Sequence, residues 1–369
     1  MLSRTQMLVA LSGIGLQLSA GYMVGPTPLR GRSSAGRALP GPLSYPALTP
    51  ARPAPFTAQR AGPLVPLAAA EGDKASSPGR LADKQNAVAV GLVKEDAGLY
   101  LALAAFQLLP LFSLDRGCGI AYFFGTALLT VRLGAKRQDI PERRTAISSK
   151  QALAAPVVSS VSLFGLYLIL RNTNIDVGFI YRALTTLVGL SSTAVVLPQL
   201  LGAALPEVAG RLPVSGPLAS LAEIPEDPPA DYQPTLDVPD LAGGLAGLLA
   251  VAVYLYPGVP LEQKFLLSNG IAWCIAMQSI GLIGISSFST ALVFLGGLFL
   301  YDIWWVFGTD VMMTVATGLE APVKFLFPAV GRTGYPFSVL GLGDVVVPAI
   351  FCSLMRSFDQ HRESTAAAA

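Results

Sequence analysis

Two aspartates stand in strongly apolar stretches near the end of this 369-residue chain. Asp302 lies in LYDIWWVFG (300–308), and Asp344 lies in LGLGDVVVP (340–348). A carboxylate at membrane depth costs at least about 2.5 kcal/mol on insertion scales, so such residues usually face the protein interior and serve a function. Two carboxyl groups in one low-dielectric site tend to share a proton, which provides one acid and one base. Such a pair can hydrolyse an amide bond.

The composition indicates that a membrane surrounds these carboxyl groups. The chain is 52% hydrophobic and 13% charged, whereas a soluble protein is about 25% charged. Its apolar stretches mostly approach the ~20 residues that cross the hydrocarbon, and in lipid they must be helical. We predict an all-α fold, a polytopic transmembrane helix bundle of about 7–8 spans. The expected spans are 97–114, 117–131, 152–170, 178–205, 241–256, 265–285, 287–308 and 337–355.

Details within these spans concern packing and helix number. Glycines suit close approach of neighbouring helices. They are Gly243, Gly244, Gly247, Gly296 and Gly297. Only Asp115 and Arg116 separate the first two spans, so residues 97–131 could form one helix or two.

Several chemistries are excluded by composition. The one histidine, His361, lies beyond the last apolar stretch, so neither a Ser-His-Asp triad nor an H-E-x-x-H site can form within the membrane. Cys118, Cys274 and Cys352 lack metal-type spacing. The net charge is +2 and the basic residues are scattered, which argues against a nucleic-acid partner. We expect no cofactor and no metal.

The loops predict an orientation. Residues 132–150 hold the densest basic cluster of the apolar region, which assigns them to the cytosolic face or its equivalent. Counting spans places 206–240 on that same face. It places 309–336 on the opposite face, although that segment contains Lys324.

The same count predicts how the two aspartates meet. Asp302 lies six residues before the end of the 287–308 span, and Asp344 lies seven residues after the start of the 337–355 span. Both would then lie about 10 Å from one membrane face. Because the two helices would be antiparallel neighbours, we expect the carboxyl groups to face each other.

The sequence motifs around the two aspartates resemble those of the signal peptide peptidase family, which are intramembrane aspartyl proteases related to presenilin. The likeness also includes VMMTVATGLEAPVKFLFP (311–328) and, more weakly, IPERRTAISSKQALAAPVVSS (140–160), and it covers roughly residues 97–360. It implies that Asp302 and Asp344 are the catalytic dyad. The residues that it implies shape the site are Tyr301, Gly341, Leu342 and Gly343. The implied substrates are transmembrane helices, as in remnant signal peptides and type II membrane proteins, and the implied location is the endoplasmic reticulum.

One family feature is missing, which keeps other functions open. No Pro-Ala-Leu motif follows Asp344, so we expect either a truncated gene product or a lost part of the active-site wall. The first alternative is a catalytically impaired member that binds transmembrane helices in membrane-protein quality control. The second is a proton-coupled transporter, although the sequence shows no inverted repeat. Assembly into homo-oligomers is also open.

The chain divides into four predicted segments. Residues 1–20 resemble a signal peptide, and residues 21–90 form a Pro-, Ala- and Arg-rich leader that is transit-peptide-like and expected to be disordered. A plastid membrane is therefore a close alternative location. Residues 97–355 are the expected transmembrane protease domain, and 356–369 form a short polar tail.

Overall fold

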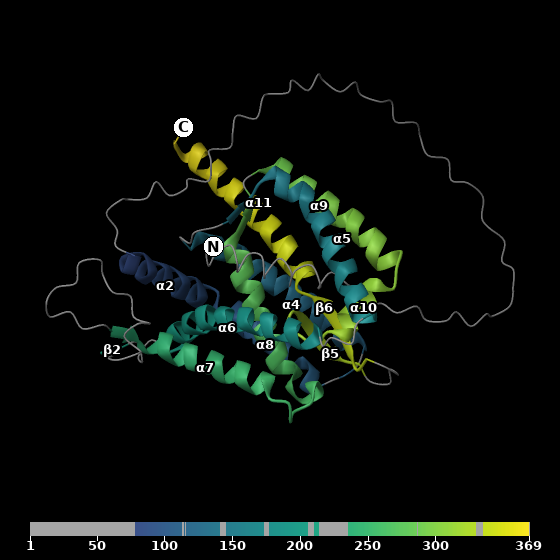
Figure 1. The fold of residues 1–369 in the computed structure, drawn as a ribbon. Helices are drawn as coiled ribbons and strands as arrows, with labels where there is room; N and C mark the ends of the chain where they lie inside the picture. The colour runs from purple at the N-terminus through teal and green to yellow at the C-terminus, as the bar shows by residue number, and fades with distance from the viewer. Residues whose placement is uncertain are drawn as a thin grey trace, which may run out of the picture.

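The computed structural model describes residues 78–112, 114, 116–140, 145–172, 177–205, 210–213, 235–285, 287–329 and 335–368. These residues form a helix bundle, which confirms the predicted all-α polytopic fold class (Figure 1). The long helices are α2 (Pro78–Glu95), α3 (Ala97–Leu108), α4 (Arg116–Lys136), α5 (Ser149–Asn172), α6 (Val177–Ala204), α7 (Val238–Leu255), α8 (Leu261–Leu282), α9 (Phe288–Asp302) and α11 (Gly343–Ala368). The short helices are η1 (Leu109–Leu111), η2 (Arg137–Asp139), the π-helix η5 (Ile303–Phe307) and α10 (Val311–Gly318).

Among the described residues, three two-stranded sheets accompany the helices. They pair β1 (Thr145–Ile147) with β4 (Ile283–Ile285), β2 (Arg211–Pro213) with β3 (Thr235–Asp237), and β5 (Lys324–Pro328) with β6 (Phe337–Gly341).

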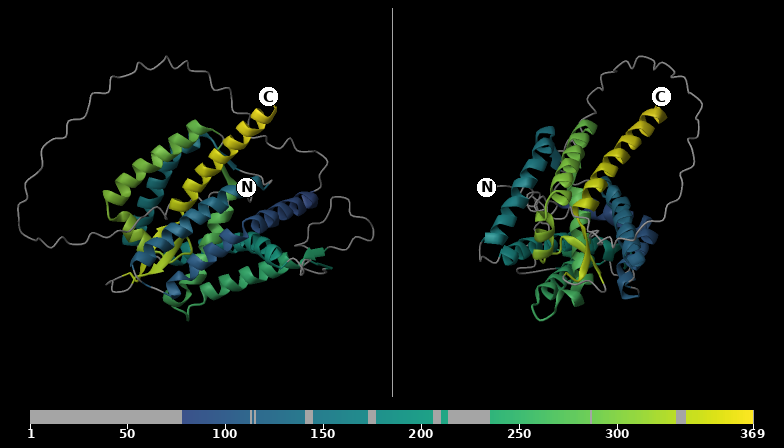
Figure 2. Two further views of the ribbon diagram at one scale, coloured as in Figure 1. Left: turned by 180° about the vertical axis from the view of Figure 1, so that it is seen from behind. Right: turned by 90° about the vertical axis from the view of Figure 1, so that its right-hand side faces the viewer.

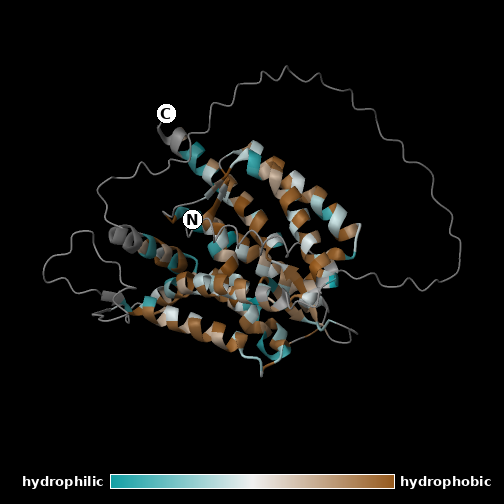
Figure 3. Cartoon of the chain, in the orientation of Figure 1, coloured by the Kyte–Doolittle hydropathy of each residue, from teal (hydrophilic) through white to brown (hydrophobic). Residues whose placement is uncertain are grey.

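The bundle has the surface of a membrane protein. In the described residues, six helices are long and apolar enough to cross a membrane, and a shorter apolar helix covers Ala97–Leu111. Figure 3 shows hydrophobic residues along the outside of α5, α7 and α9. Large apolar side chains such as Val161 of α5 and Phe299 of α9 are exposed, as lipid contact requires.

Residues 97–131, which the sequence left undecided, form two helices. α3 and α4 run antiparallel, because Gln107 contacts Tyr122 while Asp96 pairs with Lys136 at the far end. Near the turn the helices are in close contact: a Cβ added at Gly125 would lie 2.5 Å from the Phe106 ring.

Two predicted segments differ from the structure. The leader was expected to be disordered as far as residue 90, but residues 78–95 form α2, which packs against α6. Ala89 and Val93 lie on one helical face and are buried there. Residues 1–77 lie outside the described part of the chain.

The last span was expected to be helical from residue 337, and this is wrong. Residues 337–341 form strand β6, and α11 begins at Gly343. Phe337 and Val339 are residue types that favour a strand, and the antiparallel partner β5 lies beside them. Asp344 is therefore the second residue of its helix, and the predicted tail residues 356–368 continue that helix.

The glycine prediction is partly confirmed. An added Cβ would lie 2.5 Å from the Pro198 backbone nitrogen at Gly243, and 2.5 Å from Pro156 Cγ at Gly297. Gly247 is equally tight against Thr193. Gly244 and Gly296 have nothing within 4 Å of such a Cβ, so for them the prediction is wrong.

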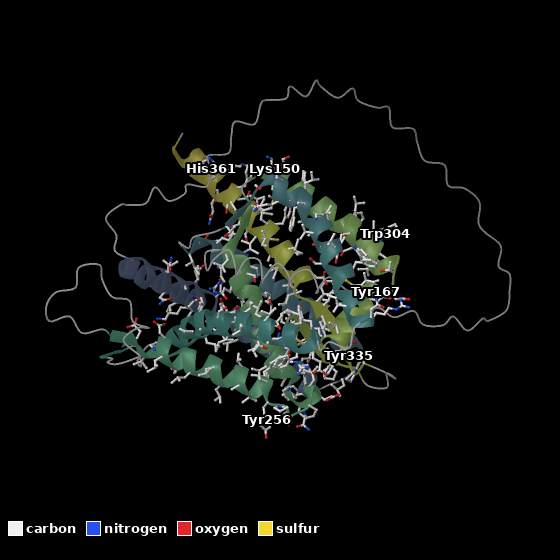
Figure 4. The ribbon with its side chains drawn as sticks, in the orientation of Figure 1. Lys150, Tyr167, Tyr256, Trp304, Tyr335 and His361 are labelled. Atoms are coloured by element: carbon white, nitrogen blue, oxygen red, sulfur yellow. The ribbon has the colours of Figure 1, made fainter. Side chains whose placement is uncertain are left out.

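Contacts between elements agree with the prediction that successive loops lie at opposite ends of the bundle. β1, which follows α4, pairs with β4, which follows α8, and Arg356 of α11 forms an ion pair with Asp139 at 2.7 Å. At the other end, Arg182 near the start of α6 lies 3.6 Å from Glu320. Figure 4 shows Lys150 and His361 at one end of the bundle and Tyr256 and Tyr335 at the other. We call these ends the basic-loop end and the hairpin end.

This arrangement predicts the side from which each end can be labelled. In a variant without Cys118, Cys274 and Cys352, we introduce Lys150→Cys or Tyr256→Cys, since both side chains are exposed. A membrane-impermeant maleimide should modify position 150 from the cytosol-equivalent side and position 256 from the opposite side. Labelling of both positions from one side of sealed vesicles would contradict the topology.

Candidate active site

Helix α5 packs against α9, the helix that carries Asp302. Gly297 removes a side chain where α9 meets Pro156 of α5, so the two helices approach closely. One turn past Asp302, Trp305 Nε1 donates a hydrogen bond to Ser160 Oγ at 2.9 Å. Ser160 in turn donates to the Pro156 carbonyl at 2.8 Å, a bond on the side of α5 that faces α9. These contacts fix the end of α9 against α5.

Asp302 ends α9, and a π-helix follows it. Single π turns occur frequently at functional sites. Tyr301 is 5% exposed and Asp302 is half-buried. Tyr301 Oη and Asp302 Oδ1 are both buried and have no hydrogen-bond partner among the described residues. Because buried polar atoms in folded proteins are nearly always paired, these two atoms are candidates to bind a substrate or its attacking water.

The residues before Asp344 convert a strand into a helix. Leu342 N donates to Val323 O at 3.3 Å and so ends the β5–β6 hairpin. The Leu342 carbonyl accepts from Val345 N at 3.1 Å and from Val346 N at 2.8 Å, which begins α11. Gly341, Leu342 and Gly343 are buried, and Asp344 is half-buried in the first turn. The residues predicted to shape the site thus form the junction that positions Asp344.

The hairpin lies inside the bundle, and Asn269 anchors it. Asn269 Oδ1 accepts from Leu326 N at 2.8 Å, and its Nδ2 donates to Leu326 O at 2.9 Å and to Tyr122 Oη at 2.8 Å. Tyr122 Oη donates to Gln107 Oε1 at 3.0 Å. Asn269 is eight residues into α8, about 12 Å from the hairpin end. Strand backbone is tolerated at such depth only where protein groups satisfy it.

Asn269 was not among the site residues expected from the sequence. The available signal was an amide side chain in an otherwise apolar span, but the strand that it binds was not expected.

The two aspartates lie toward the same end of the bundle. α9 and α11 run in opposite directions (Figure 2), and the rings of Phe288 and Phe351 lie 5.9 Å apart. The helix that carries Asp344 begins six residues later than predicted, so Asp344 lies in its first turn. The equal depth of the two aspartates stays a prediction. The pairing of the two carboxyl groups stays a prediction.

The site offers carboxyl groups that can take up and release protons. In the part of the chain that the structure describes, no group of three or more His, Cys, Asp and Glu residues could hold a metal ion.

Comparison with known proteins identifies the family. The signal peptide peptidase family model matches residues 139–368, more than half of the chain. The chain belongs to the signal peptide peptidase family. Similar proteins include a signal peptide peptidase of Homo sapiens, 32% identical over 71% of this chain and 66% of the relative. A probable intramembrane protease of Schizosaccharomyces pombe is 29% identical over 64% of this chain and 68% of the relative. No solved structure matches.

This membership confirms the predicted family and the predicted class of protein, a multi-pass intramembrane protease of the aspartic type. The chain spans about two thirds of the length of these relatives.

The anchoring of the hairpin predicts the effect of a near-isosteric change. Asn269→Leu would leave Leu326 N and O without side-chain partners at a fully buried position, and each such loss costs about 1–3 kcal/mol. We expect a lower midpoint of thermal unfolding in detergent. Thr130→Val is the control, because Thr130 is also fully buried and its Oγ1 has no hydrogen-bond partner among the described residues. An equal midpoint for the wild type and Asn269→Leu would contradict the anchoring role.

Proposed function

We propose that this protein is an aspartic endopeptidase that hydrolyses peptide bonds within transmembrane helices. Asp302 and Asp344 act as its acid–base pair. The substrates are transmembrane helices: remnant signal peptides, by analogy with the name of the human relative, and the spans of type II membrane proteins, as the family resemblance implies. The observation that carries the proposal is the buried pair of unpartnered polar atoms, Tyr301 Oη and Asp302 Oδ1, in one of two motif segments that lie toward one end of the bundle.

The chemistry divides between the two carboxyl groups. The ionised carboxyl takes a proton from water, and the water oxygen attacks the peptide carbonyl carbon. The protonated carboxyl gives its proton to the leaving amide nitrogen as the C–N bond breaks.

A second function remains in consideration. A catalytically impaired member would bind transmembrane helices and assist membrane-protein quality control. The proton-coupled transporter is disfavoured by membership in a protease family.

The acid–base roles predict the effect of removing either carboxyl group. Asp302→Asn and Asp344→Asn should each abolish cleavage of a labelled signal-peptide helix by the purified protein in bilayers, because an amide can neither accept water's proton nor supply one. For the wild type, the rate should have a bell-shaped dependence on pH that reports the pair.

The control is Asp359→Asn, which changes an exposed carboxyl late in α11 and should leave the rate unchanged. Cleavage that survives in either active-site variant would end the dyad proposal. A wild type that binds the helix without cutting it would favour the quality-control function.

The location in the cell is also a proposal. The family resemblance supports the endoplasmic reticulum, and the acid-poor leader supports a plastid membrane. A fluorescent reporter fused to residues 1–20 should enter the endomembrane system, and one fused to residues 1–90 should continue to the plastid. If the longer fusion stays in the endoplasmic reticulum, the transit-peptide interpretation is wrong.

A further inference from the structure

Lys324 is a buried cation beside the Asp344 motif. It is the first residue of β5, its Cα is in register with that of Gly341, and its side chain belongs to a residue only 5% exposed. Nζ donates to Ala316 O at 2.6 Å and to Leu319 O at 3.0 Å. These carbonyls lie at the end of α10, where the helix dipole attracts a positive charge.

The ammonium group of Lys324 also lies over an aromatic ring. Lys324 Nζ lies 5.1 Å from the centre of the Tyr335 ring, close enough for a cation–π interaction. Burial, with Glu320 and Glu262 nearby, raises the pKa of Tyr335 to about 12, so its phenol stays neutral at physiological pH. Tyr335 packs edge-on against Phe337, the first residue of β6. The Lys324 side chain therefore contacts both α10 and the hairpin.

Helix α10 continues the connection to Asp302. It packs against η5, the π-helix that directly follows Asp302, and against α5, which holds α9. Thr309 Oγ1 between η5 and α10 donates to Trp305 O at 3.1 Å. The Lys324 side chain thus connects α10, which packs against η5 and α5, to the hairpin that leads to Asp344.

We propose that Lys324 is a positioning residue for the proposed protease site, holding α10 to the β5–β6 hairpin and so setting the position of Asp344 relative to Asp302. This inference rests on the proposed function for its catalytic consequence only. The connection itself is a property of the fold. Misplacement of a catalytic group by about 1 Å can lower the rate a hundredfold. Loss of the Lys324 contacts should therefore lower kcat far more than it alters KM.

The chain supplies a matched control in Lys264. Its Nζ donates to Tyr254 O at 2.8 Å and to Tyr256 O at 3.3 Å, at the end of α7, and lies 5.4 Å from the Tyr254 ring centre. Lys264 thus makes the same kinds of contact as Lys324 and lies at the same end of the bundle. The helices that Lys264 joins, α7 and α8, carry neither aspartate.

The test compares Lys324→Met, Lys324→Arg and Lys264→Met in the full chain in bilayers. For structure, spin labels at Phe307→Cys and Ser338→Cys, without the native cysteines, report the distance between η5 and β6. For chemistry, kcat and KM are measured with a labelled signal-peptide helix, and thermal midpoints report folding.

We expect Lys324→Met to broaden the distance distribution and to lower kcat by on the order of tenfold to a hundredfold, with little change in KM. Lys324→Arg keeps the charge and the hydrogen-bond donors, so it should retain most of the wild-type distance distribution and most of the wild-type kcat. Lys264→Met removes the same kinds of contact from a half-buried position, so it should lower the thermal midpoint less, with an unchanged distance and kcat.

An unchanged distance in Lys324→Met would overturn the proposal, as would a loss of kcat equal to that of Lys264→Met. If Lys324→Met does not fold, Lys324→Gln takes its place in the same comparison. If the wild type does not cleave, the proposed function fails, and the distance measurement alone then decides the role of Lys324.

Discussion

The site depends on one constraint, that strand backbone inside a membrane protein must have its polar groups paired. The hairpin that leads to Asp344 enters the bundle between α4 and α8, and its strands satisfy each other along one edge only. The outer edge of β5 is completed by Asn269, whose amide binds both polar atoms of Leu326. Without that pairing, the backbone N–H and C=O groups of Leu326 would be buried without partners, at a cost of about 1–3 kcal/mol each.

The same constraint explains why helices far from the motifs matter. Tyr122 of α4 and Gln107 of α3 continue the hydrogen-bond chain that begins at Leu326. Both residues precede the region that the family model matches, residues 139–368. The N-terminal helices therefore support the hairpin as part of the fold. On the other side, Lys324 connects the hairpin to α10, so Asp344 is held from two directions.

Much of this arrangement follows from the sequence. Apolar runs of nearly 20 residues gave the spans, and the basic loop gave an orientation that the β1–β4 pairing and the Arg356–Asp139 contact agree with. The hairpin did not follow, because a mostly apolar stretch of five residues such as FSVLG is too short for its periodicity to separate a strand from a helix start. Its partner strand β5 ends at Pro328, and Asn269 lies 57 residues away from Leu326. Such long-range pairs decide the start of α11, and hence the level of Asp344.

The central claim is that both carboxyl groups act on one reacting peptide bond. It is tested most directly by the affinity of the wild type for a helical peptide whose scissile bond is replaced by a hydroxyl-bearing isostere. The reference compound has a methylene in place of that hydroxyl-bearing carbon. The account predicts that the hydroxyl compound binds on the order of a hundredfold tighter or more, and that Asp302→Asn and Asp344→Asn each abolish the difference. Equal affinities of the wild type for both compounds would contradict it.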